Sequence, residues 1–196
     1  MNLPNKLTVS RLLLTMLFVI VVFSEMPFRE TIALVLFIAA SLTDYFDGHI
    51  ARRDQIITNF GILMDPLADK ILICSAFIAF VGLRLIPAWM VVIIVARELA
   101  ITGLRLLAAS KQIVLAAEGY GKHKTASQVT AIISILVLIS YPEWGPWSRA
   151  VFGFEIFGAP WVVGFTALAK WVAVLLTVLS GSLYLWRNRA LYLGDM

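Results

Sequence analysis

Residues 41–70 decide the fold, and they read SLTDYFDGHIARRDQIITNFGILMDPLADK. Four aspartates lie in this stretch on either side of a short polar break, and apolar runs continue from both of its ends. A charged side chain in the bilayer core costs roughly 2.5–3.5 kcal/mol on insertion scales. If the flanking runs span a membrane, the four carboxylates need a strong compensating interaction. They are Asp44, Asp47, Asp65 and Asp69.

The composition supports a membrane location for these runs. Of the 196 residues, 61% are hydrophobic and 14% are charged, whereas a soluble domain is roughly 45–50% apolar and about 25% charged. A core of this size could not hide such an apolar excess from water, so an ordinary soluble domain is excluded. The single cysteine, Cys74, excludes an intrachain disulfide and a cysteine-based metal cage.

Apolar runs near the length that a spanning helix needs, about 20 residues, occur six times along the chain. We therefore expect an all-α integral membrane protein with six transmembrane helices, in a single domain that covers residues 1–196. Turn-forming or charged residues separate the runs, as at Met26-Pro27 and Arg52-Arg53-Asp54. The predicted spans are residues 7–24, 29–50, 62–83, 86–109, 126–142 and 158–186.

The charges of the connecting segments predict the orientation. The N-terminus and the segments 52–53, 111–124 and 187–189 hold nine Lys and Arg residues, whereas the opposite loops hold three arginines and four glutamates. Cytoplasmic loops carry the excess of Lys and Arg, so we expect both termini in the cytoplasm. This bias also accounts for the net charge of +4 without a nucleic-acid partner.

The spacing of the four aspartates indicates a metal site. Asp44 and Asp47 are three residues apart, and Asp65 and Asp69 are four apart, so each pair projects from one face of its helix. Consecutive helices with a short connection lie antiparallel, so the pairs can face each other near the cytoplasmic end. Converging carboxylates repel unless they are protonated or bridged by cations, and hard oxygen ligands suit Mg²⁺, Mn²⁺ or Ca²⁺ better than zinc. Two divalent ions would neutralise the four carboxylates, and such a site polarises phosphoryl oxygens and stabilises a leaving group.

Neighbouring residues leave room for a phosphate-bearing ligand. Gly48 and Ala51 lie on the side of the helix near the first pair, Arg52 can fork onto a phosphate, and Gly61 lets the next helix begin close to the ligand. Helix caps or interfacial residues are the structural alternative for either aspartate pair alone. Intramembrane carboxylates also mark transporters, but a transporter is expected to spread them over several spans and the midplane. A divalent-cation transporter stays open as the non-enzyme alternative.

Eight fixed positions in this stretch resemble the signature of the CDP-alcohol phosphotransferase family. They are Asp44-x2-Asp47-Gly48-x2-Ala51-Arg52-x8-Gly61-x3-Asp65-x3-Asp69, and the six-span layout resembles the family over essentially the whole chain. The resemblance implies that a second alcohol displaces CMP from a CDP-linked alcohol. It implies that the four aspartates hold two divalent cations, Mg²⁺ or Mn²⁺, and that Asp69 is also the general base. It further implies contacts to the cytidine nucleotide and its pyrophosphate from Gly48, Ala51, Arg52 and Gly61.

Charged residues in the fourth and fifth predicted spans favour a phosphorylated acceptor. Glu98, Thr102 and Arg105 fall at i, i+4 and i+7 and form one polar stripe. An acceptor without a phosphate, such as choline, would not need cations near the metal site. The structural alternatives are a positive-inside anchor pair for Lys122 and Lys124 and a buried ion pair for Arg97 and Glu98. The residues that we predict to bind the acceptor phosphate are Arg97, Arg105, Lys122, Lys124 and Thr125.

Within the family, three elements most closely resemble bacterial phosphatidylglycerophosphate synthases. They are Arg97-Glu98, the Gly-Lys-x-Lys-Thr segment at 121–125, and Pro4-Asn5-Lys6-Leu7-Thr8-x2-Arg11. This resemblance implies CDP-diacylglycerol as the donor, sn-glycerol 3-phosphate as the acceptor, and Asn5, Thr8 and Arg11 on the CDP-alcohol side. It also implies a homodimer in the inner membrane with the active site facing the cytoplasm. A cardiolipin synthase and a phosphatidylinositol-phosphate synthase are the alternatives within the family. Lys170, in the sixth span, has no assigned role.

Overall fold

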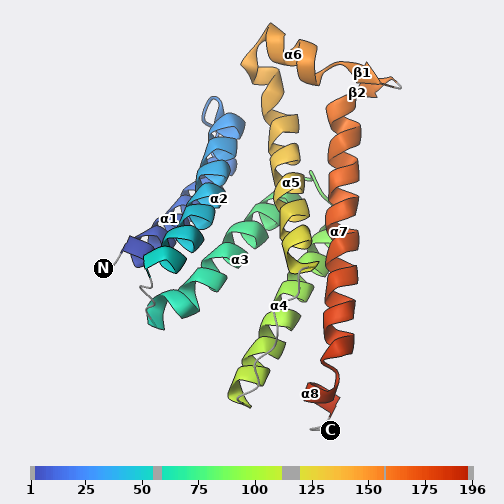
Figure 1. Cartoon of the computed structure of the whole chain (residues 1–196). Helices are drawn as coiled ribbons and strands as arrows, with labels where there is room; N and C mark the ends of the chain where they lie inside the picture. The colour runs from blue at the N-terminus through green and yellow to red at the C-terminus, as the bar shows by residue number, and fades with distance from the viewer. Residues whose placement is uncertain (1–2, 55–58, 112–119, 157, 194–196) are drawn as a thin grey trace.

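The computed structural model is a bundle of long helices (Figure 1). It describes residues 3–54, 59–111, 120–156 and 158–193; within these ranges the description excludes the side chains of residues 3–7, 44–54, 59–66, 69, 110, 120–122, 190 and 193. The long helices in the described ranges are α1 (Leu3–Val22), α2 (Arg29–Asp54), α3 (Asn59–Gly82), α4 (Ala88–Ser110), α5 (Tyr120–Ser140) and α7 (Trp161–Arg187). The shorter elements are η1 (Tyr141–Trp144), α6 (Pro146–Phe152), the antiparallel strands β1 (Glu155–Ile156) and β2 (Ala159–Pro160), and α8 (Ala190–Leu193).

Each of these long helices coincides with one predicted span, and the small β1–β2 hairpin is a departure from the all-α expectation. The largest difference is at α5, which begins six residues before the predicted span, at Tyr120. Its first turns hold Lys122 and Lys124, which favour a helix, so the helix extends beyond the apolar run although Gly121 is a poor helix former. Within the described residues, two stretches are long and apolar enough to cross a membrane by length and composition, His123–Trp144 and Trp161–Arg187.

The helices pack around an apolar core that runs through the bundle. α1 lies against α2 and α3, α5 lies against α2 and α7, and α4 lies against α3 and α7. The rings of Phe18 on α1 and Phe37 on α2 are both fully buried, with centroids 6.0 Å apart. In contrast, large apolar side chains on the outer face of α7 are exposed, among them Leu168 and Leu175. This arrangement suits a bundle that is surrounded by lipid.

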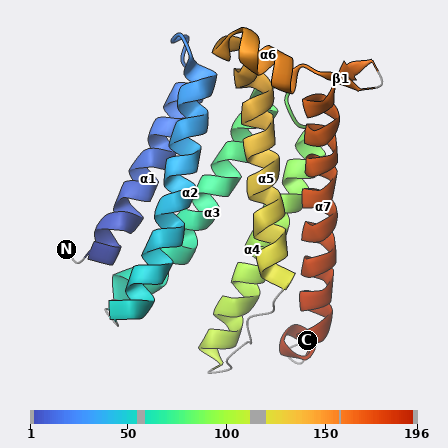
Figure 2. The same cartoon turned by 45° about the horizontal axis from the view of Figure 1, so that its top comes forward.

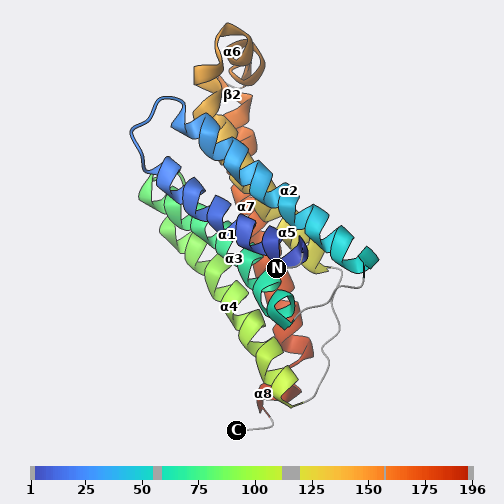
Figure 3. The same cartoon turned by 90° about the vertical axis from the view of Figure 1, so that its left-hand side faces the viewer.

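The two described chain ends lie toward the same end of the bundle (Figure 2). The α1–α2 and α3–α4 connections, α6 and the hairpin lie at the other end, and the view in Figure 3 shows α6 and α8 at opposite extremes. At the α6 end, Trp144 Nε1 donates to Thr31 Oγ1 (2.8 Å), and this hydroxyl donates to Glu143 Oε2 (3.0 Å). These bonds tie the start of α2 to η1.

Lys170 holds the connection between α3 and α4. Its Nζ donates to the backbone carbonyl of Leu85 at 3.1 Å from a half-buried position on α7. The carbonyl lies between the end of α3 at Gly82 and the start of α4 at Ala88. The structure thus gives a packing role to a lysine for which the sequence indicated none.

Candidate active site

The signature residues lie on α2 and α3, toward the end of the bundle that holds the described chain ends (Figure 1). Asp44 and Asp47 lie in the C-terminal half of α2, and Asp65 and Asp69 lie in the N-terminal half of α3. Among the side chains that the structure describes, no three His, Cys, Asp or Glu residues are grouped to hold a metal. The four aspartates are outside that set, so their convergence stays a prediction. The other predicted site residues whose side chains lie outside it are Asn5, Gly48, Ala51, Arg52, Gly61 and Lys122.

α1 contributes two predicted site residues from the buried face of its first turns. The side chains of Thr8 and Arg11 are both fully buried, on a helix that packs against α2 and α3. A buried guanidinium is costly unless an anion compensates it. Arg11 is therefore placed where a negatively charged ligand or carboxylates of the adjacent helices would stabilise it.

A buried charged cluster joins α4 to α5. Lys124 Nζ donates to Glu98 Oε1, and Arg97 Nη1 lies 3.4 Å from the same oxygen. The side chains of Lys124 and Glu98 are only 6% and 8% exposed. A positive-inside anchor would place its ammonium in the interfacial water, so the anchor alternative does not describe Lys124. The ion pair between Arg97 and Glu98 is observed, and Lys124 also pairs with Glu98.

The polar stripe of α4 extends from this cluster toward α3. Thr102 Oγ1 donates to the Glu98 carbonyl at 2.6 Å and accepts a hydrogen bond from Lys70 Nζ. Lys70 directly follows Asp69 in the sequence. The hydrogen bond from Lys70 to Thr102 thereby connects α3, which carries the predicted base, to α4, which carries Glu98.

The structure does not bring Arg105 into the cluster. Arg105 lies eight residues beyond Arg97, which is about 12 Å along the helix, and its side chain is exposed. It contacts Tyr184 of α7, with Nε 3.5 Å from the hydroxyl and Cζ 5.8 Å from the ring centroid. Thr125 is half-buried next to Lys124. Only Arg97 and Lys124 of the predicted phosphate ligands share a described contact partner.

α7 supplies residues that the sequence analysis missed. Ser180 Oγ lies 3.4 Å from Arg97 Nη2, and Thr177 Oγ1 accepts from Gln128 Nε2 at 3.0 Å. With Gly181 and Tyr184, the two hydroxyl residues form a buried stripe on α7. Their spacing of i, i+3, i+4 and i+7 within an apolar run was the signal that could have found them.

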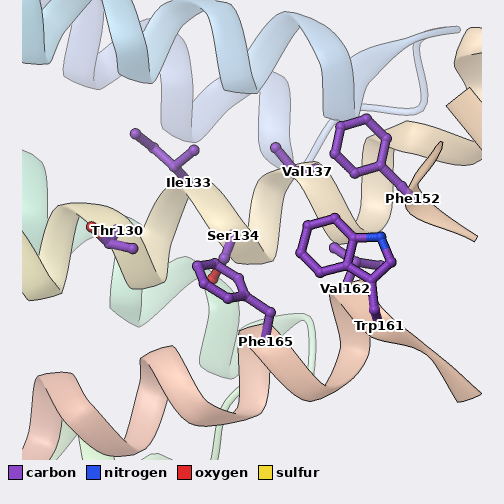
Figure 4. A pocket seen from close by; sticks show the side chains of 8 residues that line it. All are labelled: Thr130, Ile133, Ser134, Val137, Phe152, Trp161, Val162 and Phe165. Atoms are coloured by element: carbon purple, nitrogen blue, oxygen red, sulfur yellow. The ribbon is translucent and has the colours of Figure 1, made fainter. Parts of the chain in front are cut away.

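A cavity of about 240 Å³ lies elsewhere, between α5 and α7 close to α6 (Figure 4). The polar side-chain groups in its wall belong to Thr130, Ser134 and Trp161, and each donates to a backbone carbonyl. Because these groups are already bonded and the remaining wall is apolar, the cavity offers no catalytic group. Its lining residues are Thr130, Ile133, Ser134, Val137, Phe152, Trp161, Val162 and Phe165.

Comparison with known proteins gives matches over nearly the whole chain. A family model described as CDP-alcohol phosphatidyltransferase matches residues 1–180. A Bacillus subtilis protein named CDP-diacylglycerol–glycerol-3-phosphate 3-phosphatidyltransferase is 41% identical, over 95% of both chains. A protein of the same name from Cereibacter sphaeroides is 32% identical, over 99% of this chain and 98% of its own. A CMP-forming cardiolipin synthase from Oryza sativa is 31% identical, over 69% of this chain and 46% of its own.

Proposed function

Because the chain belongs to the CDP-alcohol phosphatidyltransferase family, we propose that it transfers the phosphatidyl group of CDP-diacylglycerol to sn-glycerol 3-phosphate. The products are phosphatidylglycerophosphate and CMP. The observation that carries this proposal is the 41% identity, over 95% of both chains, to a relative whose name states this donor and this acceptor. The relative with the cardiolipin synthase name matches over only 46% of its length.

We propose that all six long helices span the inner membrane, with both termini and the active site toward the cytoplasm. The positive charges of the segments at the end that holds the termini support this orientation. In this arrangement the donor keeps its acyl chains in hydrocarbon while its nucleotide head reaches α2 and α3. The water-soluble acceptor arrives from the cytoplasm. We further propose that the protein acts as a homodimer.

The four aspartates of the signature suit two divalent cations, Mg²⁺ or Mn²⁺, as ligands. Asp44, Asp47, Asp65 and Asp69 offer hard carboxylate oxygens from two consecutive helices. When bound there, the cations would neutralise pyrophosphate charge and polarise the phosphoryl oxygens. Around them, the small residues at 48, 51 and 61 leave space for the nucleotide.

In the proposed mechanism, Asp69 accepts the proton of the attacking hydroxyl. The hydroxyl oxygen of the acceptor bonds to the phosphorus that carries the diacylglycerol, and the bond from this phosphorus to the bridging oxygen of CMP breaks. CMP leaves with its charge partly balanced by Arg52. Because such a displacement needs alignment and charge neutralisation more than covalent help, no phosphoenzyme is required. Arg11, Thr8 and Asn5 contact the CDP-alcohol from α1.

The charged cluster of α4 and α5 supports a phosphorylated acceptor. Arg97 and Lys124 bring two positive charges to the single negative charge of Glu98. The remaining positive charge attracts a phosphate in a site that water screens poorly. Lys122 and Thr125 flank Lys124 on α5, and the exposed Arg105 lies where it can steer the anion toward the site.

Product identification tests the acceptor. The purified protein receives CDP-diacylglycerol, Mg²⁺, and an equimolar mixture of glycerol 3-phosphate and phosphatidylglycerol, and the lipids are analysed by mass spectrometry. We expect phosphatidylglycerophosphate. Cardiolipin as the main product would keep the family reaction and overturn the acceptor.

A further inference from the structure

Gly181 lies where α7 approaches the side chain of Arg97. A Cβ atom built on Gly181 would lie 2.8 Å from Arg97 Cγ, 3.6 Å from its Nε and 3.8 Å from its Cβ. Protein interiors are packed too closely to accept a carbon–carbon contact of 2.8 Å without movement. The stem of Arg97 therefore occupies the space that any other residue at 181 would fill.

The guanidinium of Arg97 is held loosely. Its Nη1 contact to Glu98 and its Nη2 contact to Ser180 both measure 3.4 Å, longer than the 2.7–3.2 Å of an ordinary N–H···O bond. Arg97 Nε is buried and has no hydrogen-bond partner among the described residues. A buried donor without an acceptor is costly, and an anionic oxygen is the strongest acceptor for a guanidinium. Arg97 therefore retains donor capacity for a ligand.

We propose that Gly181 is a positioning residue for the acceptor phosphate. Its missing side chain lets Arg97 run along α7 and present its guanidinium beside Lys124, and Ser180 Oγ lies 3.4 Å from that guanidinium on the same turn of α7. This inference rests on the proposed function, because the ligand is the phosphate of the acceptor. A methyl group at 181 pushes Arg97 Cγ aside and misplaces the donors at its end.

The test is the variant Gly181→Ala, measured by steady-state kinetics with both substrates. We expect the KM for glycerol 3-phosphate to rise about tenfold, since a misplacement of about 1 Å is enough for such losses, while the KM for CDP-diacylglycerol stays unchanged. Gly164→Ala on α7 and Gly103→Ala on α4 are matched controls, because a Cβ at either position meets nothing within 4 Å. Ser180→Ala should raise the same KM by a smaller factor.

A double-mutant cycle with Arg97 separates this role from simple helix packing. Arg97→Ala removes the Cγ atom that the new methyl group would meet, so adding Gly181→Ala to it should leave the acceptor KM unchanged and should not lower the melting temperature. If Gly181→Ala alone unfolds the protein, the double variant should fold again. Two results would overturn the role of Gly181. One is a higher acceptor KM or a lower melting temperature in the double variant than in Arg97→Ala. The other is an unchanged acceptor KM in Gly181→Ala alone. A wild-type enzyme that does not use glycerol 3-phosphate as an acceptor would instead overturn the proposed function.

Discussion

Glu98 places a carboxylate inside a cluster that we assign to an anionic ligand. By charge alone it weakens phosphate binding, yet it accepts contacts from both Lys124 and Arg97. Without it, Lys124 and Arg97 would repel each other, and each would lose a counter-charge that offsets its loss of water. We infer that Glu98 preorganises the two cations and that the phosphate completes the charge balance.

Lys124→Ala should raise the KM for glycerol 3-phosphate at least tenfold, with a smaller change in the KM for CDP-diacylglycerol. The physical reason is the loss of one of the two cations that outweigh Glu98. Steady-state kinetics with each substrate varied in turn provides the measurement. Lys111→Ala is the control, because Lys111 is exposed at the end of α4. An unaltered acceptor KM in the Lys124 variant would remove this residue from the phosphate site.

Asp69→Asn should lower the rate of CMP release by a factor on the order of 10²–10⁴. The amide keeps the size of the side chain but cannot accept the proton of the attacking hydroxyl. The melting temperature in detergent, compared with that of wild type, checks that the fold persists. Glu155→Gln in the exposed hairpin is a control for removing one acidic charge. Near-normal turnover of the Asp69 variant would exclude this carboxylate as the base.

At the scale of helices, hydrophobic runs were sufficient to predict where each long helix lies. The eight-position signature lies on α2 and α3, and the chemistry that it implies stays a prediction. The start of α5 was missed because the helix extends beyond the apolar run that was its only signal. The burial of Lys124 could not be predicted from the sequence either. A lysine at a span boundary is usually an anchor, and only its ion-pair partner indicates that it is buried. That partner, Glu98, is set by tertiary packing across 26 residues.

The contribution of α7 shows the same limit. In the sequence, Ser180 and Gly181 are small residues in an apolar span, which helix packing alone can explain. Only the approach of α7 to α4 shows that Arg97 occupies the space at Gly181. A periodic pattern indicates the buried face of a helix, but it does not identify the side chain on the other side of the contact.

Lys170→Met should destabilise the protein by about 0.5–1.5 kcal/mol, because it removes the hydrogen bond from Lys170 Nζ to the Leu85 carbonyl. The melting temperature should fall while both KM values stay near those of wild type, since the α3–α4 connection lies at the end of the bundle opposite to the proposed site. Leu168→Met, at an exposed position of the same helix, is the matched control. A normal melting temperature together with a changed KM would assign Lys170 to the reaction instead of the fold.

For the whole molecule, the proposed six-span topology makes a prediction about the two ends of the bundle. In a Cys74→Ser background, which removes the native cysteine, new cysteines are placed at the exposed positions Glu155 and Arg189. A membrane-impermeant maleimide should label Glu155→Cys in intact cells and Arg189→Cys only after permeabilisation. The hairpin then faces outward, and the C-terminal end of α7 faces the cytoplasm. Labelling of both positions from the same side would contradict this topology.

The most direct test of the central claim is the release of CMP by the purified protein in detergent. The complete reaction contains CDP-diacylglycerol, Mg²⁺ and glycerol 3-phosphate, and each component is omitted in turn; chelation of the metal by EDTA followed by added Mg²⁺ checks that its loss is reversible. We predict that CMP appears only in the complete reaction and in the restored sample. No CMP release from folded, metal-supplied protein with glycerol 3-phosphate, phosphatidylglycerol or inositol phosphate would contradict the account and favour the divalent-cation transporter.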